Sequence, residues 1–274
     1  MKYHKIEIKI KTKHKASYFT GSMLRGAMGY ALKKVTCINP SYKCEGCFAQ
    51  SSCLYYNFYE QKNNFHKYRF DIELGSGKFD FGLYLFDDAC DGLAYVLSAL
   101  KIMLSEIGLT KENVTFGELE FFLNGESIYE NGEFTSIDKA QNSFQVDSFC
   151  PNIKIKLLTP LRIKKSNKFL RDDVGLEDIL RSIYQREQEI FYGEKVFKLD
   201  YEPSYMTDIK LLKYEELVRK SNRQRQKMNM DGVVGEIVVM GLDERSYRLL
   251  KLGEVIGVGK QTVMGLGRIE VVDI

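Results

Sequence analysis

Residues 244–271 read ERSYRLLKLGEVIGVGKQTVMGLGRIEV, and this stretch decides how the end of the chain folds. Apolar residues recur at helical spacing over 244–256, and a strand pattern begins at Arg268. Between them lie four glycines that form two Gly-x-Gly pairs: Gly257, Gly259, Gly265 and Gly267. The stretch therefore predicts a helix, a glycine-rich connection over 257–267 and a final strand.

The patterns that precede this stretch complete a half-chain of alternating elements. Residues 153–158 alternate as a strand does, residues 176–191 have helical spacing, and two more strand patterns occupy 205–212 and 233–240. The second half therefore has the order β-α-β-β-α-β.

The first half repeats this order. Strand patterns occupy 3–12, 69–74, 78–86 and 114–123, and helical patterns occupy 21–35 and 87–107, the latter capped by Asp87 or Asp88 and ended by Gly108. Two such halves predict an α+β protein with tandem ferredoxin-like (RRM-like) domains, whose antiparallel sheets carry helices on one face. We expect an N-terminal domain over 1–147, with a cysteine-rich insertion at 37–53, and a C-terminal domain over 148–274. The alternative is a single α+β domain.

Composition excludes several classes of protein. The 274 residues contain 40 Lys and Arg against 37 Asp and Glu, so the chain is not generally polycationic. No apolar run approaches the roughly 20 residues of a membrane span, and the lysine-rich start lacks the apolar segment of a signal peptide. We therefore expect a soluble, cytoplasmic protein with neither a membrane nor DNA as a partner.

Positive charge is nevertheless concentrated in three segments, residues 1–15, 162–171 and 210–227. Clustered Lys and Arg neutralise phosphates, which is typical of nucleic-acid binding. The alternative for any one segment is a solvated surface.

The glycine-rich connection also has two interpretations. Its backbone N–H groups could form an anion-binding concavity, or the glycines could serve a tight turn from helix to strand. The order of residues excludes a Walker A loop and a Rossmann fingerprint.

Four cysteines lie close together in the expected loop after the first helix: Cys37, Cys44, Cys47 and Cys53. Their Cys-x2-Cys core is a common chelating pair, so we favour a structural zinc with four thiolate ligands. An iron–sulfur cluster and packed free thiols are the alternatives.

Four segments of the chain resemble segments of a known protein family. GVGKQTVMGLGRIEV (257–271) resembles the glycine-rich signature of the RAMP superfamily, and in particular of the CRISPR repeat-processing endoribonucleases. Three more segments agree in the same order: GSMLRGAMGYAL (21–32) before the cysteine loop, TPLRIK (159–164) and RKSNRQRQKMNMDGVVGEI (219–237).

The resemblance implies metal-independent cleavage of CRISPR precursor RNA within its repeats. The RNA's own 2′-hydroxyl would attack, leaving a 2′,3′-cyclic phosphate and a 5′-hydroxyl. The alternative is a non-catalytic RAMP subunit that holds guide RNA in a CRISPR effector complex.

Such a reaction needs a base, an acid and positive charge at the phosphate. The resemblance places a catalytic histidine between the first helix and the second strand, where His66 lies. Supporting candidates are Arg25 and Tyr30 on the first helix and Lys67 beside His66. The expected RNA contacts are Arg219, Arg223, Arg225, Gly257, Gly259, Lys260, Gly265, Gly267 and Arg268.

Overall fold

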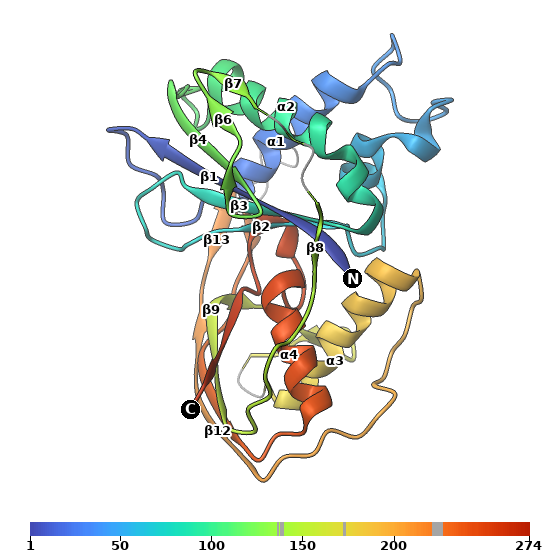
Figure 1. Cartoon of the computed structure of the whole chain (residues 1–274), viewed down its shortest axis with the longest axis vertical. Coiled ribbons are helices and arrows are strands. Elements are labelled where there is room, and N and C mark those ends of the chain that lie inside the picture. Colours follow the sequence, from blue (N-terminus) through green and yellow to red (C-terminus); the bar gives the residue numbers. More distant parts are fainter. Residues whose placement is uncertain (136, 138–139, 172–173, 221–226) are drawn as a thin grey trace. The chain divides into compact units, whose positions relative to one another are not determined.

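The computed structural model describes residues 1–135, 137, 140–171, 174–220 and 227–274. These residues form two compact units, Met1–Ser143 and Phe144–Ile274 (Figure 1). We describe each unit by itself.

The first unit is built around β1 (Lys2–Lys11), whose alternate residues Ile6, Ile8 and Ile10 are buried. Its neighbours in the antiparallel sheet are β3 on one side and β4 on the other, in the order β2-β3-β1-β4-β5. The bounds are β2 (Tyr68–Asp71), β3 (Phe81–Phe86), β4 (Glu118–Leu123) and β5 (Glu126–Ser127). A separate small hairpin joins β6 (Tyr129–Glu130) to β7 (Glu133–Phe134).

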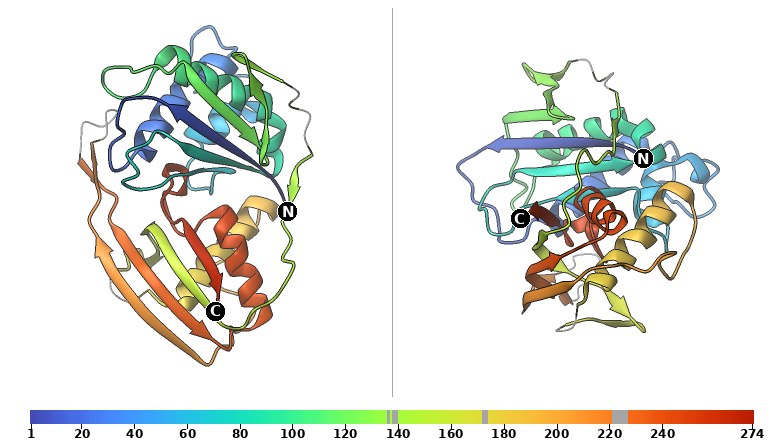
Figure 2. Two further views of the ribbon diagram at one scale, coloured as in Figure 1. Left: turned by 60° about the vertical axis from the view of Figure 1, so that its left-hand side comes forward. Right: turned by 60° about the horizontal axis from the view of Figure 1, so that its bottom comes forward.

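Two helices cover one side of this sheet and contact each other (Figure 2). They are α1 (Gly21–Thr36) and α2 (Leu93–Ile102). Short helical turns accompany them: η3 (Asp87–Gly92) and η4 (Met103–Ile107) flank α2, η1 (Gln50–Ser52) lies within the cysteine loop, and η2 (Tyr56–Glu60) follows that loop. The unit ends at β8 (Asn142–Ser143), which pairs with Lys2 and Tyr3 of β1.

The second unit repeats the same strand order. Its antiparallel sheet is ordered β12-β15-β9-β16, with β9 (Ile153–Leu161) and β15 (Gly232–Met240) in the centre. The edge strands are β12 (Thr207–Glu215) and β16 (Ile269–Asp273). The helices α3 (Leu176–Glu187), extended by η5 (Gln188–Tyr192), and α4 (Glu244–Ile256) contact each other on one face of the sheet (Figure 2). Two small ribbons complete the unit: β10 (Lys164–Lys165) with β11 (Lys168–Phe169), and β13 (Val218–Lys220) with β14 (Lys227–Asn229).

Both units thus have the β-α-β-β-α-β order and the 2-3-1-4 sheet order of a ferredoxin-like fold, so the predicted tandem fold is confirmed. Among the helices within the described ranges, none is long and apolar enough to span a bilayer.

One local prediction was wrong. Asp87 and Asp88 do not cap the helix that follows β3, because no side-chain cap bond forms there. Their carboxylates accept hydrogen bonds from Lys67 instead, at 2.6 and 2.9 Å.

Candidate functional site

The glycine-rich connection runs between α4 and β16 and packs against the end of β9. Val258 N–H donates to Gly267 O at 2.9 Å, and Gly267 N–H donates to Pro160 O at 3.2 Å. Gly267 has a φ of +70°, and a Cβ there would lie 1.8 Å from Val258 O. Glycine is required here by the conformation and by the close approach of the two backbones.

Other N–H groups of this connection also donate to partners inside the second unit. The acceptors are Gly253 O for Gly257, Ser182 Oγ for Gly259, Arg162 O for Lys260, Thr262 O for Gly265 and Thr159 Oγ for Arg268. The N–H groups of the four glycines therefore stabilise the tight turn from helix to strand and are not available to a phosphate.

Arg162 holds this region together, although in the sequence it does not differ from the other basic residues of 162–171. It follows β9 directly and its side chain is 6% exposed. Its Nε donates to Gln261 Oε1 at 2.9 Å, its Nη1 donates to Asp231 O, and its guanidinium lies 4.3 Å from the centre of the Phe169 ring. Burial lowers the pKa of Arg162, yet an arginine stays charged in proteins. A buried cation therefore joins the glycine-rich connection to the β10–β11 ribbon.

Further positive charge gathers around Lys260. Partial burial lowers the pKa of Lys260, and the neighbouring cations Arg186 and Lys164 lower it further, whereas Glu189 opposes them. Lys164 lies 5.0 Å from the Phe169 ring. Like charges held this close make the end of the unit electropositive, which attracts anions.

The three arginines expected to bind RNA cannot be placed in the same way. Arg223 and Arg225 lie outside the described residues, and for Arg219 only the backbone, in β13, is described.

In the first unit, Arg25 of α1 meets two tyrosines. Its guanidinium lies 4.9 Å from the centre of the Tyr59 ring, and its backbone oxygen accepts a hydrogen bond from the Tyr59 hydroxyl at 3.0 Å. The Tyr59 and Tyr68 rings are 6.1 Å apart. Burial raises the pKa of both tyrosines, and the charge of Arg25 acts against that rise. Side-chain hydrogen bonds from Tyr59 and Arg25 also lower the pKa of Tyr68, so the three side chains form one hydrogen-bonded group.

His66 contacts one of these tyrosines, Tyr68. Its ring centre lies 5.9 Å from that of Tyr68, and its Nδ1 lies 3.3 Å from Asn57 O. Because a carbonyl oxygen only accepts, this bond assigns the proton of the neutral ring to Nδ1 and the lone pair to Nε2. The structure therefore brings Arg25 and His66, two of the four predicted catalytic residues, into one cluster, which we call the tyrosine cluster (Arg25, Tyr59, His66 and Tyr68).

The other two catalytic candidates are placed differently. Tyr30 follows Arg25 by five residues on α1, which turns its side chain about 140° around the helix, and it is 68% exposed. Lys67 is held in ion pairs by Asp87 and Asp88, and these carboxylates raise its pKa against the opposing effect of burial. The structure therefore does not bring Tyr30 to the tyrosine cluster, and it holds Lys67 in ion pairs, while the catalytic role of Lys67 stays a prediction.

The cysteine loop carries four half-buried thiols at Cys37, Cys44, Cys47 and Cys53, none in a disulfide. Burial raises the pKa of Cys44, and Cys37 and Cys53 are close enough to contribute. Even so, across residues 1–135, 137, 140–171, 174–220 and 227–274 no group of three or more His, Cys, Asp or Glu is arranged to hold a metal ion. The structure does not support the expected zinc site, which stays a prediction, as does the iron–sulfur alternative.

Comparisons with known proteins agree with this architecture. Residues 1–142 match the family model AF_1859_N, described as an N-terminal domain, and residues 155–269 match the model of the CRISPR-associated endoribonuclease Cas6. Among curated proteins, no sequence matches the chain significantly.

Solved Cas6 structures share the fold over the whole chain. One Cas6 product complex has a TM-score of 0.61 at 13% identity, covering 99% of this chain and 100% of that chain. A second has a TM-score of 0.57 at 13% identity, covering 99% of both chains. Thermus thermophilus Cas6 has a TM-score of 0.54 at 12% identity, covering 99% of this chain and 98% of its own.

The two family models follow one another along the chain, and the second carries the glycine-rich connection from which the resemblance was inferred. Residues 155–269 therefore match the Cas6 family of CRISPR-associated endoribonucleases, and the solved Cas6 structures, at 12–13% identity, show that the whole chain shares their fold.

Proposed function

We propose that the chain cleaves CRISPR precursor RNA within its repeats without a catalytic metal ion. In this reaction the 2′-hydroxyl attacks the adjacent phosphorus, the bond to the 5′-oxygen breaks, and the products carry a 2′,3′-cyclic phosphate and a 5′-hydroxyl. The observation that carries the proposal is the tyrosine cluster, in which Arg25 lies over the Tyr59 ring, His66 lies against the Tyr68 ring, and these two rings are 6.1 Å apart.

The chemistry assigned to this cluster follows from its atoms. His66, whose Nδ1 lies 3.3 Å from Asn57 O, would act as the base that accepts the proton of the 2′-hydroxyl. Arg25 supplies positive charge for the pentacoordinate phosphate.

In the second unit, we propose that the electropositive end around Lys164, Lys260 and the Phe169 ring contacts the RNA backbone and a base. Cations neutralise phosphates, and an aromatic ring stacks on bases. Because the N–H groups of Gly257, Gly259, Gly265 and Gly267 already have partners, we expect the side chains to make these contacts.

A single-turnover assay with a repeat RNA in EDTA tests this proposal. We expect cleavage with the stated ends, and no cleavage when the nucleotide 5′ of the scissile phosphate lacks its 2′-hydroxyl. His66→Ala should slow cleavage about 100-fold or more, the usual scale for acid–base catalysis. His14→Ala is the matched control, because His14 is exposed beyond the end of β1.

Two results would contradict the mechanism. Loss of cleavage in EDTA would require a metal, and wild-type cleavage by His66→Ala would remove the base. Tight RNA binding without cleavage under all conditions would favour the non-catalytic subunit of a CRISPR effector complex.

A further inference from the structure

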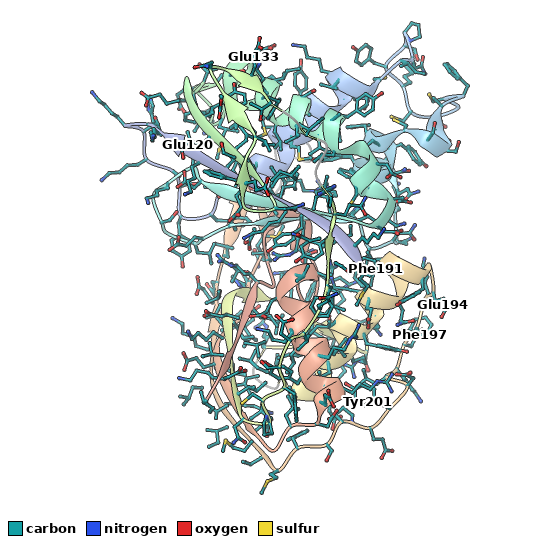
Figure 3. The ribbon with its side chains drawn as sticks, in the orientation of Figure 1. Glu120, Glu133, Phe191, Glu194, Phe197 and Tyr201 are labelled. Atoms are coloured by element: carbon teal, nitrogen blue, oxygen red, sulfur yellow. The ribbon has the colours of Figure 1, made fainter. Side chains whose placement is uncertain are left out.

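A pocket of about 360 Å³ opens on the helical side of the second unit, away from the residues discussed so far. It lies between the ends of α3 and η5, the start of α4, and the segment that follows η5. Figure 3 labels Glu194 and Tyr201, which lie on that segment and line the pocket. The volume is at the lower end of the range for small-molecule sites, which suits a ligand of about the size of a nucleoside.

Glu187 gives this pocket a buried hydrogen-bond acceptor. Its side chain is 8% exposed, and its Oε1 lies 3.5 Å from Nη1 of Arg248. That separation is long for a charge-assisted hydrogen bond. Burial raises the pKa of Glu187, against the effect of Arg248. A ligand that donates hydrogen bonds to this carboxylate would therefore be stabilised.

Aromatic rings and a second arginine form the wall of the pocket. Arg245 lies 4.2 Å above the Tyr201 ring and binds Asp200 at 2.5 Å. The Tyr201 hydroxyl lies 3.0 Å from Ser246 Oγ, which itself donates to Asp243. These bonds hold the wall in place without a ligand. Tyr192, which also lines the pocket, is 60% exposed and offers its ring to a ligand.

We propose that this pocket binds a nucleobase, and that guanine fits it best. A flat, uncharged group can stack on Tyr192 and on the plane of Arg245. The N1–H and N2–H groups of guanine form a pair of donors on one edge, which matches a carboxylate that only accepts. Arg245 and Arg248 are each about half exposed (51% and 49%) and can reach a phosphate attached to the base.

An arginine side chain from a protein partner is the main competitor for this pocket. It would also stack on tyrosine and bind Glu187. Three carboxylates (Glu187, Glu194 and Asp200) and two arginines line the pocket, so the charge of this side chain would not be repelled. However, burying a charged guanidinium costs more desolvation than burying a neutral base.

The base could come from a free nucleotide or from the RNA strand, and two experiments distinguish these sources. The first titrates GMP, AMP, CMP and N-acetyl-arginine amide into the full chain, followed by tyrosine fluorescence, since the chain has no Trp. The second measures the affinity of repeat RNAs in which each guanosine in turn is replaced by inosine, which lacks the N2 amino group. The RNA experiment rests on the proposed function, whereas the nucleotide titration does not.

Tyr192→Ala and Glu187→Gln are the test variants, and Phe197→Ala is the matched control. Phe197 is an aromatic residue of the same segment, is 80% exposed and does not line the pocket. We expect GMP to bind more tightly than AMP or CMP, or one inosine replacement to weaken RNA binding. In either case Tyr192→Ala should reduce the affinity about 10-fold, the scale of one stacked base. Glu187→Gln should abolish the preference for guanine, and Phe197→Ala should change neither.

The inference is overturned if none of the nucleotides binds and no inosine replacement acts through these residues, or if arginine amide binds in place of GMP. If the wild-type protein cleaves repeat RNA, and the pocket variants bind RNA and GMP as tightly as the wild type does, only the assignment of the pocket fails. If the wild-type protein neither binds nor cleaves repeat RNA, the proposed function fails. In that case the GMP titration alone decides whether the pocket binds a nucleobase.

Discussion

Replacing Gly267 with alanine should destabilise the second unit by more than its backbone conformation alone explains. Gly267 and Gly193 have nearly the same φ, +70° and +71°. At Gly193 an added Cβ meets nothing within 4 Å, whereas at Gly267 it would lie 1.8 Å from Val258 O. Gly193→Ala therefore isolates the left-handed conformation, which costs about 1–2 kcal/mol in a residue with a Cβ.

The additional loss at Gly267 comes from the displaced backbone. Val258 O would have to move by more than 1 Å to reach an ordinary contact distance. That shift would break two hydrogen bonds, Val258 N–H to Gly267 O and Gly267 N–H to Pro160 O. Each contributes about 1 kcal/mol. We therefore expect a total loss of about 3–4 kcal/mol, compared with about 1–2 kcal/mol for Gly193→Ala.

Urea unfolding of both variants beside the wild type, followed by circular dichroism, measures this difference. Equal losses in the two variants would refute the reasoning, because the close approach of Val258 would then contribute nothing.

Three further predictions concern other parts of the chain. Burial lowers the pKa of His4 below 6.5, so the unfolded chain binds a proton at this histidine more readily than the folded chain does. The stabilisation should therefore be complete above about pH 6.5 and decrease as the pH drops below that value. Urea midpoints at several pH values should fall less steeply for His4→Gln than for the wild type, and equal slopes would rule this out. Lys67→Met should lower the free energy of unfolding by about 1 kcal/mol, because Lys67 is partly exposed in both ion pairs; a large loss of cleavage at unchanged stability would instead return Lys67 to the catalytic residues. Element analysis of protein purified without chelator checks the zinc prediction, since four thiolates would hold about one ion per chain; finding no metal would leave free thiols.

The long elements could be predicted because their residues repeat with a clear period. The alternation in 3–12 and the helical spacing in 244–256 agree with β1 and α4 to within about a residue. The turns η1 and η2 were missed, because three or five residues are too few to show a period. The capping role assigned to Asp87 was wrong, because Lys67, distant in sequence, binds that carboxylate.

In the candidate functional sites too, local patterns could be predicted, whereas contacts between distant segments could not. The glycines at 257–267 could be found from their spacing, but the partners of their N–H groups depend on β9 and α3, which no local pattern shows. In the sequence, Arg162 is one of five basic residues in 162–171, and no local pattern distinguishes it from Lys164. Only the structure shows that Arg162 is buried and joins three segments. His66 and Arg25 were selected from the resemblance, and their common contact with tyrosines required the fold.

The pairing of β8 with the start of β1 has a consequence for synthesis on the ribosome. Because the first and last strands of the first unit meet, that unit has all its strands once residue 143 has left the exit tunnel. At roughly 5–20 residues per second, residues 144–274 take about 7–26 s to add, and part of this time passes before residue 143 leaves the tunnel. Mixed α/β domains of this size fold in milliseconds to seconds. The first unit can therefore be folded before the second is complete, which keeps its apolar strands from pairing with the equivalent strands of the second.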